Sequence, residues 1–370
     1  MNPRERLLNA LRGEPADRVP LALEGSDYRT RANIDAGGDP ARREIAHRIF
    51  DQTHCFVGCR TSVNRYLVTP EQHIREISRE SNNGEVTITS EIDTPKGTLT
   101  AVTETNPVTN TTWTIKYPVE SLEDIEKIRS VPWGVPEKVA PPDMSRLPAD
   151  FGRRGITRAG ISSPFVCVAG MMPYQYFLRL CATHLDLMKE LTAICRDRIL
   201  DILDVVLADG TVEYVWMGGC EWVTPPMASP AIYEELVQKF EKPVIDRIHA
   251  GGALAHVHCH GNVRSTLEMV IERGGDFFEP VEPPPDGDIT FAEAKALAAG
   301  RITLGGNVEA RVLENEDIET VEAACRAAFE GTKHRMVFQT TAGPIGEITP
   351  RMLANYHRMI DVWQELSPIG

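Results

Sequence analysis

Eight short apolar runs recur along this chain of 370 residues, separated by longer stretches whose apolar residues have helical spacing. This alternation is typical of a parallel β-sheet with crossover helices. Eight strands is also the number that a closed (β/α)8 barrel requires. We therefore predict an α/β fold, a TIM barrel, with residues 1–370 as a single domain. The predicted strands are Val19–Leu23, Cys55–Gly58, Gly155–Ile161, Tyr214–Met217, Ala253–His258, Asp276–Phe278, Ile302–Leu304 and Met336–Phe338.

The later stretches between these runs have readable helix ends. Residues 184–208 have apolar residues at helical spacing. Ser229-Pro230 starts another helix with a cap and a first-turn proline, and Gly251-Gly252 ends it. The remaining predicted helices are residues 262–273, 316–330 and 350–366.

One region departs from the alternation. Residues 83–118 alternate Thr and Val with polar residues around a Pro95-Lys96-Gly97 turn, which is typical of β-structure with one wet face. We interpret this region as a β-hairpin insertion between the second and third strands of the barrel.

The acidic composition limits the partners of the chain. Its formal net charge of −14 disfavours a nucleic-acid backbone or an anionic membrane surface as a partner. No apolar run approaches the length of a membrane span, and the opening residues do not have the pattern of a signal peptide. The eight cysteines are scattered, as free thiols in a reducing compartment would be. We therefore predict a cytoplasmic protein.

The active site of such a barrel lies at the carboxyl ends of its strands. Titratable residues concentrate after the fourth, fifth and sixth predicted strands, so the site is predicted there. The polar residues that follow the strands are Glu24 and Asp27, Cys59 and Arg60, Ser162 and Ser163, Cys220 and Glu221, His258 to His260, Glu279 and Glu282, Asn307 and Glu309, and Gln339 to Thr341.

Three alternating histidines, His256, His258 and His260, mark the end of the fifth strand. Alternate residues of a strand point to the same side, and neutral imidazole is a common zinc ligand. Cys259 faces away from them in a regular strand, whereas a turn beginning here would bring it round. The alternative is that one or two of these histidines are hydrogen-bonded groups of the core.

Two carboxylates on the neighbouring strands are candidates for catalysis. Glu221 could be a metal ligand, a general base or an ion-pair partner of a substrate amine. Glu279 lies one strand beyond the histidines. For both residues the alternative is an ordinary solvated carboxylate.

Four more residues are candidates for substrate binding. Glu24 follows the first strand, and Asn307 follows a glycine pair that would let the backbone approach a ligand. Met171 and Tyr174 begin a helix past the third strand, where they would line an apolar pocket or pack in the core.

Several motifs along the chain are shared with a known family. They are the opening segment from Asn2 to Pro20, Ser163-Pro164-Phe165, Ser229-Pro230 with Gly251-Gly252, and Ile302–Val308. Together they resemble the uroporphyrinogen decarboxylase superfamily over nearly the whole chain. The resemblance implies a distorted (β/α)8 barrel and one of two chemistries. These are cofactor-free decarboxylation of uroporphyrinogen, and zinc-dependent methyl transfer involving corrinoid proteins.

The chain departs from the true decarboxylases in two places. They carry an Arg-Gln-Ala-Gly-Arg-Tyr signature whose arginines hold substrate carboxylates, where this chain has Glu24-Gly25-Ser26-Asp27-Tyr28-Arg29-Thr30. An octa-anionic porphyrinogen would meet acids there, which is unfavourable if the site is buried. The decarboxylases also have a Gly-His-Gly near the C-terminus, and Thr340–Pro344 contains no histidine. The resemblance is therefore nearer to the methyltransferase branch.

The methyltransferases have His-x-Cys at the end of the fifth strand and a third ligand, a cysteine, at the end of the last. His258 matches the first ligand, and the second becomes His260, or Cys259 with a shifted register. The third position falls near Ala342, so another residue completes the site or no metal binds. Imidazole and carboxylate ligands would make the ion a harder Lewis acid, suited to activating oxygen or nitrogen. The candidates to complete the site are Glu221, Cys220 and Glu279.

The leading hypothesis is transfer of a methyl group from a small O- or N-methyl substrate to a corrinoid on a separate protein. Zinc would be bound by His258, His260 and Glu221, and the catalytic residues would be Glu221, His258 and Glu279. The alternative is a lyase of the decarboxylase type that acts on a smaller carboxylic acid without a cofactor. A third reading is a barrel that only binds a ligand. A homodimer is the default expectation.

Overall fold

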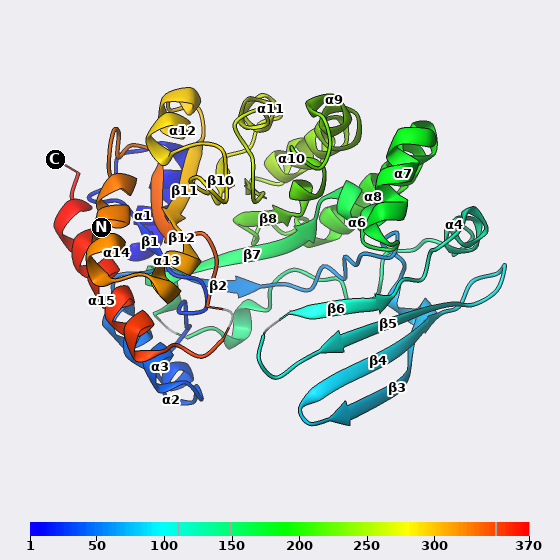
Figure 1. Ribbon diagram of the computed structural model, residues 1–370, viewed down its shortest axis with the longest axis horizontal. Helices are drawn as coiled ribbons and strands as arrows, with labels where there is room; N and C mark the ends of the chain where they lie inside the picture. The colour runs from blue at the N-terminus through cyan, green and yellow to red at the C-terminus, as the bar shows by residue number, and fades with distance from the viewer. Residues whose placement is uncertain (110, 149, 345, 370) are drawn as a thin grey trace.

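A parallel sheet organises the computed structural model, which describes residues 1–369 except 110, 149 and 345. In this described part, eight parallel strands form one curled sheet in the order β1-β12-β11-β10-β9-β8-β7-β2 (Figure 1). Each predicted apolar run overlaps one of these strands, so the strand prediction is confirmed. The strands are β1 (Leu21–Ala22), β2 (Cys55–Gly58), β7 (Gly155–Ser162), β8 (Tyr214–Gly218), β9 (Leu254–His258), β10 (Phe277–Glu279), β11 (Thr303–Val308) and β12 (Met336–Thr340).

The sheet curls like the predicted distorted barrel, with an open seam between β1 and β2 in the residues described. β1 and β2 stand at the two ends of the strand order, and no ladder joins them in the residues described. β1 contains only two residues, which pair with Phe338 and Gln339 of β12. Pro20 precedes it, and its carbonyl accepts a hydrogen bond from the Phe338 N–H at 2.9 Å, so this short strand is anchored on the side of β12.

Helices line the outside of the curled sheet (Figure 1). The predicted helices at residues 184–208, 316–330 and 350–366 correspond to α8, α14 and α15. The helix predicted from Ser229-Pro230 is divided by a π-helical turn, η4. The helices are α1 (Pro3–Arg12), α2 (Arg31–Asp35), α3 (Pro40–Ile49), α4 (Leu122–Arg129), α5 (Phe151–Arg154), α6 (Pro164–Ala169), α7 (Tyr174–Thr183), α8 (Leu185–Val206), α9 (Pro230–Tyr233), η4 (Glu234–Gln238), α10 (Lys239–Ala250), α11 (Leu267–Glu272), α12 (Phe291–Ala298), α13 (Ala310–Asn315), α14 (Ile318–Ala328) and α15 (Pro350–Leu366), with 3-10 turns η1 (Glu71–His73), η2 (Met144–Arg146) and η3 (Cys220–Val223).

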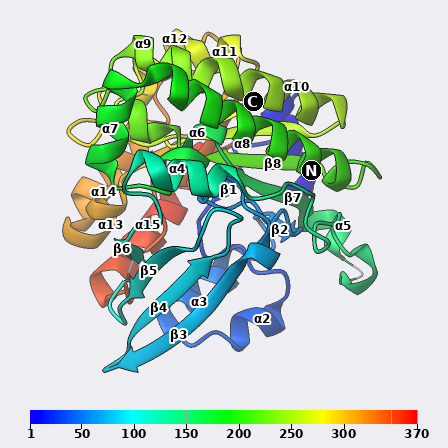
Figure 2. The same ribbon diagram turned by 90° about the vertical axis from the view of Figure 1, so that its right-hand side faces the viewer.

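The insertion after β2 is larger than the predicted hairpin. Within the described residues it is an antiparallel sheet of four strands in the order β3-β4-β5-β6, and Figure 2 shows these strands side by side below α4. The strand that the prediction missed, β3, is charged and mostly exposed, so its sequence lacks an apolar alternation. Asn83 and Gly84, both with positive φ, form the tight turn that joins it to β4. The strands are β3 (Ile74–Asn82), β4 (Glu85–Ile92), β5 (Leu99–Thr105) and β6 (Thr112–Lys116).

Helix α1 closes the amino-terminal end of the curled sheet. Its side chains Leu7, Leu8 and Leu11 pack against Tyr214 and Phe277 inside the sheet. A capping box between Asn2 and Glu5 fixes where the helix starts. This packing leaves the carboxyl ends of the strands as the open end.

A helix that crosses a lipid bilayer must be long and apolar. No helix in the described part of the chain meets both conditions.

Candidate active site

A cavity of about 770 Å3 extends inside the curled sheet from Leu7 of α1 to the carboxyl ends of the strands. Its lower wall is apolar because the helix α1 packs there, and its upper wall is polar. This cavity is the candidate active site, and it opens at the strand ends where the sequence analysis expects one. The polar and aromatic wall residues include Glu24, Arg158, Trp216, His256, His258, His260, Glu279 and Gln339.

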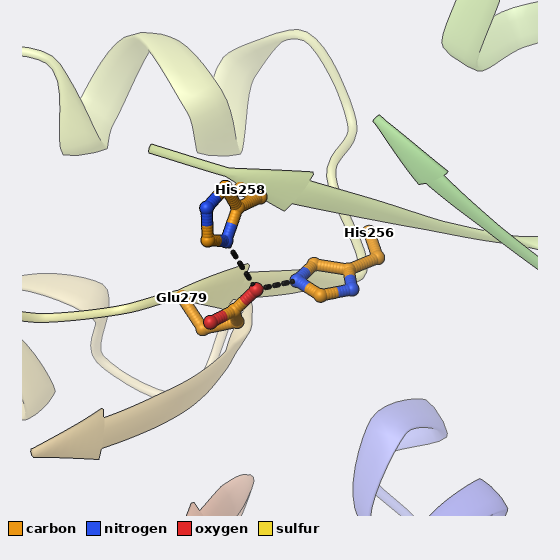
Figure 3. A group of neighbouring side chains, drawn as sticks. All are labelled: His256, His258 and Glu279. Atoms are coloured by element: carbon orange, nitrogen blue, oxygen red, sulfur yellow. Dashed lines mark hydrogen bonds and ion pairs between the residues drawn. The ribbon is translucent and has the colours of Figure 1, made fainter. Parts of the chain in front are cut away.

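His256, His258 and Glu279 form a compact histidine–glutamate cluster on this wall. Oε1 of Glu279 lies 2.7 Å from Nε2 of His256 and 2.6 Å from Nδ1 of His258 (Figure 3). The two histidines alternate along β9 and so face the same side. Glu279 on β10 pairs in register with His258, which brings its carboxylate under both rings.

Two further hydrogen bonds orient the cluster. Gln339 Nε2 donates to Oε2 of Glu279 at 2.9 Å, so both carboxylate oxygens have partners. The Tyr214 hydroxyl is hydrogen-bonded to Nδ1 of His256. A hydroxyl can donate or accept, so this bond is compatible with either tautomer of the imidazole. Burial raises the pKa of Tyr214 well above its ordinary value, which keeps its proton in place.

The charges within the cluster support one another. Burial raises the pKa of Glu279, but attraction to His258 and His256 outweighs it and holds the pKa well below its ordinary value. Burial lowers the pKa of His258, but the Glu279 carboxylate raises it to about 9. The pKa of His256 is lowered because burial dominates there. Glu279 is therefore a carboxylate that already holds positive charge beside it.

His260 lies apart from the cluster, although it was predicted as a metal ligand. β9 ends at His258, so the alternation that would align His260 with the other two histidines stops there. Its Nδ1 instead lies 2.7 Å from Oε1 of Glu282, whose Oε2 accepts a hydrogen bond from the Gly261 N–H at 2.5 Å. The His260 ring is 4.7 Å from the His258 ring, edge to face, and lines the cavity.

Glu221 is also outside the cluster, although it was predicted as a ligand and a catalytic residue. It lies on η3, the turn that follows β8. Its Oε2 is buried and forms no hydrogen bond with the residues described. Its negative charge helps to raise the pKa of His258, after the larger effects of burial and of Glu279.

The four predicted substrate-binding residues are divided between wall and core. Glu24 lines the cavity, where its Oε2 accepts a hydrogen bond from the Gly343 N–H at 3.1 Å. Asn307 is buried at the end of β11. Met171 is fully buried in the core, and the Tyr174 hydroxyl donates to the Trp222 carbonyl at 2.5 Å. The cavity wall, as far as it is described, includes only Glu24 of the four.

Four residues line the cavity although no role was predicted for them: Arg158, Tyr214, Trp216 and Gln339. Arg158 lies within an apolar run that was treated as a buried strand. Its position in the strand could have identified it, because alternate residues of β7 and β8 face the inside of the sheet and Arg158 is one of these. Gln339 was among the polar residues after the strands but had no neighbour in sequence to suggest its bond to Glu279.

The histidine–glutamate cluster fits a divalent metal ion by its donors. One ligand atom from each of His256, His258 and Glu279 lies within 4.8 Å of the others. Two imidazoles and one carboxylate are a known ligand set of catalytic zinc, which keeps a fourth position for water or substrate. Tyr214 and Gln339 would serve as the outer hydrogen-bond partners that such ligands require.

Comparison with known proteins identifies the family. Residues 103–365, more than half of the chain, match the family model described as uroporphyrinogen decarboxylase (URO-D). No curated protein matches the sequence. A methyltransferase from Methanosarcina mazei has a similar structure, with a TM-score of 0.60, 16% identity and coverage of 99% of each chain. At this identity the likeness concerns the fold alone.

A second solved structure is similar to a lower degree. It is a B12-independent methionine synthase from Shewanella sp. W3-18-1 in complex with selenomethionine, with a TM-score of 0.40 and 10% identity. The match covers 79% of this chain and 75% of that one. The family match, together with the curled eight-stranded sheet, shows that the chain belongs to the uroporphyrinogen decarboxylase (URO-D) family.

Proposed function

We propose that this protein is a methyltransferase that moves a methyl group from a small O- or N-methyl substrate to a corrinoid carried by a separate protein. The observation that carries the proposal is the histidine–glutamate cluster, a ligand set for a catalytic metal inside the cavity. Glu24 and Asp27 lie on the cavity wall, in the segment where the decarboxylases carry arginines. That difference favours methyl transfer over decarboxylation of a porphyrinogen.

Zinc, when bound, would act as a Lewis acid on the leaving oxygen or nitrogen. His256, His258 and Glu279 would hold it. Glu279 keeps its negative charge because its pKa is low, and Gln339 fixes the direction of its carboxylate. His258 would give up its proton when the ion binds, so metal affinity rises with pH.

The leaving heteroatom departs with the bonding electron pair and needs a proton. His260 lines the cavity, and Glu282 holds its Nδ1, which leaves Nε2 for proton transfer. Glu221 is proposed to act on His258 through its charge. Asn307, Met171 and Tyr174 support the walls of the site rather than contact the substrate.

The second candidate is a lyase that acts on a small carboxylic acid without a cofactor. One observation favours it: the Glu279 carboxylate is already paired with His258, whose pKa is raised, so its charge is compensated without a cation. His258, with its raised pKa, would then hold the proton that replaces carbon dioxide.

Metal analysis and a methyl-transfer assay distinguish the two functions. Protein purified without chelators is analysed for zinc and incubated with a corrinoid protein and a panel of O- and N-methyl compounds. We expect about one zinc per chain, a methylated corrinoid, and loss of both in the His258→Ala variant. Trace metal with an active His258→Ala variant would exclude the zinc mechanism. Carbon dioxide release from a metal-free enzyme would support the lyase.

A further inference from the structure

Arg158 on β7 brings a cation into the cavity at a level below the histidine–glutamate cluster. Its side chain lines the cavity and is partly exposed to it. Arg158 pairs in register with Tyr214 of β8 and with Gly58 of β2, so it faces the inside of the sheet with Tyr214. Its guanidinium lies over the Phe56 ring, 4.5 Å from the ring centre.

No carboxylate among the described residues forms an ion pair or a hydrogen bond with Arg158. The titratable groups near its charge are His54, Tyr214 and His256. His54 is neutral, because it is buried and lies near arginine charges. Burial, Arg154 and Arg158 lower the pKa of His54 to about 3. The arginine therefore has the Phe56 ring as its partner, which offsets only part of the cost of removing a cation from water.

The space beside the guanidinium is open. Gly160 lies two residues further along β7 on the same face, and a Cβ atom there would meet no atom within 4 Å. A Cβ atom at Gly58, across from Arg158, would meet only the Arg158 carbonyl oxygen, at 3.9 Å. Two neighbouring strands thus leave room for a ligand next to the unpaired cation.

The walls around this room are aromatic. Phe56 and Tyr214 are stacked with their ring centres 5.4 Å apart, and Trp216 lines the same cavity. Trp216 is in register with His256, so it lies above Arg158 at the base of the cluster, and its ring is 5.1 Å from the His258 ring. Flat apolar groups pack well against such rings. Tyr214 is level with Arg158 and Phe56 lies below it, so a cation and aromatic rings line the same part of the cavity, which suits an acid with a planar body.

We infer that Arg158 binds the carboxylate of the substrate, and that the substrate is a planar, aromatic-type acid whose far end reaches the histidine–glutamate cluster. The identity of that far end, a methylated oxygen or nitrogen, rests on the proposed function. β7 and β9 are two strands apart, a span of about 10 Å. A guanidinium can bind a carboxylate through two parallel hydrogen bonds, which would fix the substrate direction.

Binding of benzoate to metal-free protein tests the inference, with the uncharged benzamide as the matched probe. Titration calorimetry is expected to show benzoate binding and benzamide binding at least about tenfold more weakly. Arg158→Gln should weaken benzoate binding about 10- to 100-fold and leave benzamide binding unchanged. Arg158→Lys should restore part of the benzoate affinity, because it retains the charge without the planar fork.

Arg179→Gln is the control variant, because Arg179 also stacks on a ring, Tyr176, but lies outside the cavity. It should bind benzoate like the parent, and thermal unfolding should show that every variant is folded. Equal affinity of the parent for both probes, no benzoate binding by the parent, or undiminished binding by Arg158→Gln would each overturn the inference. The assay uses neither metal nor corrinoid, so its failure is separate from failure of the methyltransferase proposal.

Discussion

Gln339 on β12 reaches across β11 to hydrogen-bond the Oε2 atom of Glu279 on β10, and the strand between them carries a glycine at that level. The bond is 2.9 Å long. A Cβ atom at Gly305 of β11 would lie 2.7 Å from Cβ of Glu279 and 2.9 Å from Oε1 of Gln339. The missing side chain of Gly305 therefore makes this bond sterically accessible.

Gln339→Ala is expected to weaken zinc binding by about 10- to 100-fold, because it removes the partner that orients the Glu279 carboxylate. Competition with a chromophoric chelator measures the affinity. Gln364→Ala on α15, whose side chain contacts Gln52 far from the cluster, is the control. Equal zinc affinity in the two variants would refute the orienting role.

Gly305→Ala is expected to destabilise the protein by about 1–3 kcal/mol, because the added methyl group is forced against Glu279 and the Phe277 ring. Gly160→Ala is the matched control, since its methyl group enters open space. The free energy of unfolding is measured by urea denaturation. Similar losses in both variants would mean that the cluster can move aside for a methyl group.

The raised pKa of His258 predicts a pH dependence of stability in the metal-free protein. This pKa rises from 6.5 to about 9 on folding, so its contribution is complete below pH 6.5 and is lost as pH rises through 9. Glu279→Gln removes the carboxylate that raises it. The difference in unfolding free energy between parent and variant should therefore shrink from pH 6.5 to 9. A constant difference across that range would contradict the ion pair.

Leu11→Ala is expected to cost about 2–5 kcal/mol, because Leu11 is fully buried where α1 closes the sheet. Leu122→Ala, with a side chain that is 46% exposed, should cost less than about 0.5 kcal/mol. Chemical denaturation of both variants gives the comparison. A small loss for Leu11→Ala would show that α1 contributes little to the core.

The strands could be predicted from the sequence because a parallel sheet buries both faces and leaves apolar runs. β3 could not, since its charged residues face water and only pairing with β4 makes it a strand. The run Val19–Leu23 was apolar enough to predict a full strand, yet only Leu21 and Ala22 pair. The apolar character of a run predicts that its side chains are buried. Whether the run pairs as a strand depends on where the neighbouring backbone lies.

The strand ends led to the cavity that we take as the candidate site, and His258 and Glu279 were among the residues predicted for it, but their pairing with each other was not predicted. Alternation correctly placed His256 and His258 on one side, and it failed at His260 because the strand stops before it. The partnership of Glu279 with these histidines depends on the register between β9 and β10, which a single sequence does not contain. Arg158 was not predicted as a site residue, because the sequence around a charged residue in an apolar run does not show that its side chain faces a cavity.

The seam between β1 and β2 is the place where the wall of the curled sheet is easiest to open. Every other neighbouring pair in the curled sheet is fastened by a ladder of backbone hydrogen bonds, and widening the cavity there would break several of them. Among the residues described, no backbone ladder between β1 and β2 resists widening of the cavity at the seam. Helix α15 contacts the segment before β1 near this seam, where the Trp363 indole N–H donates a hydrogen bond to the Val19 carbonyl at 2.8 Å. Opening motions of the cavity should therefore concentrate at this edge, and the backbone amides of β1 and β2 should exchange with solvent faster than those of the central strands.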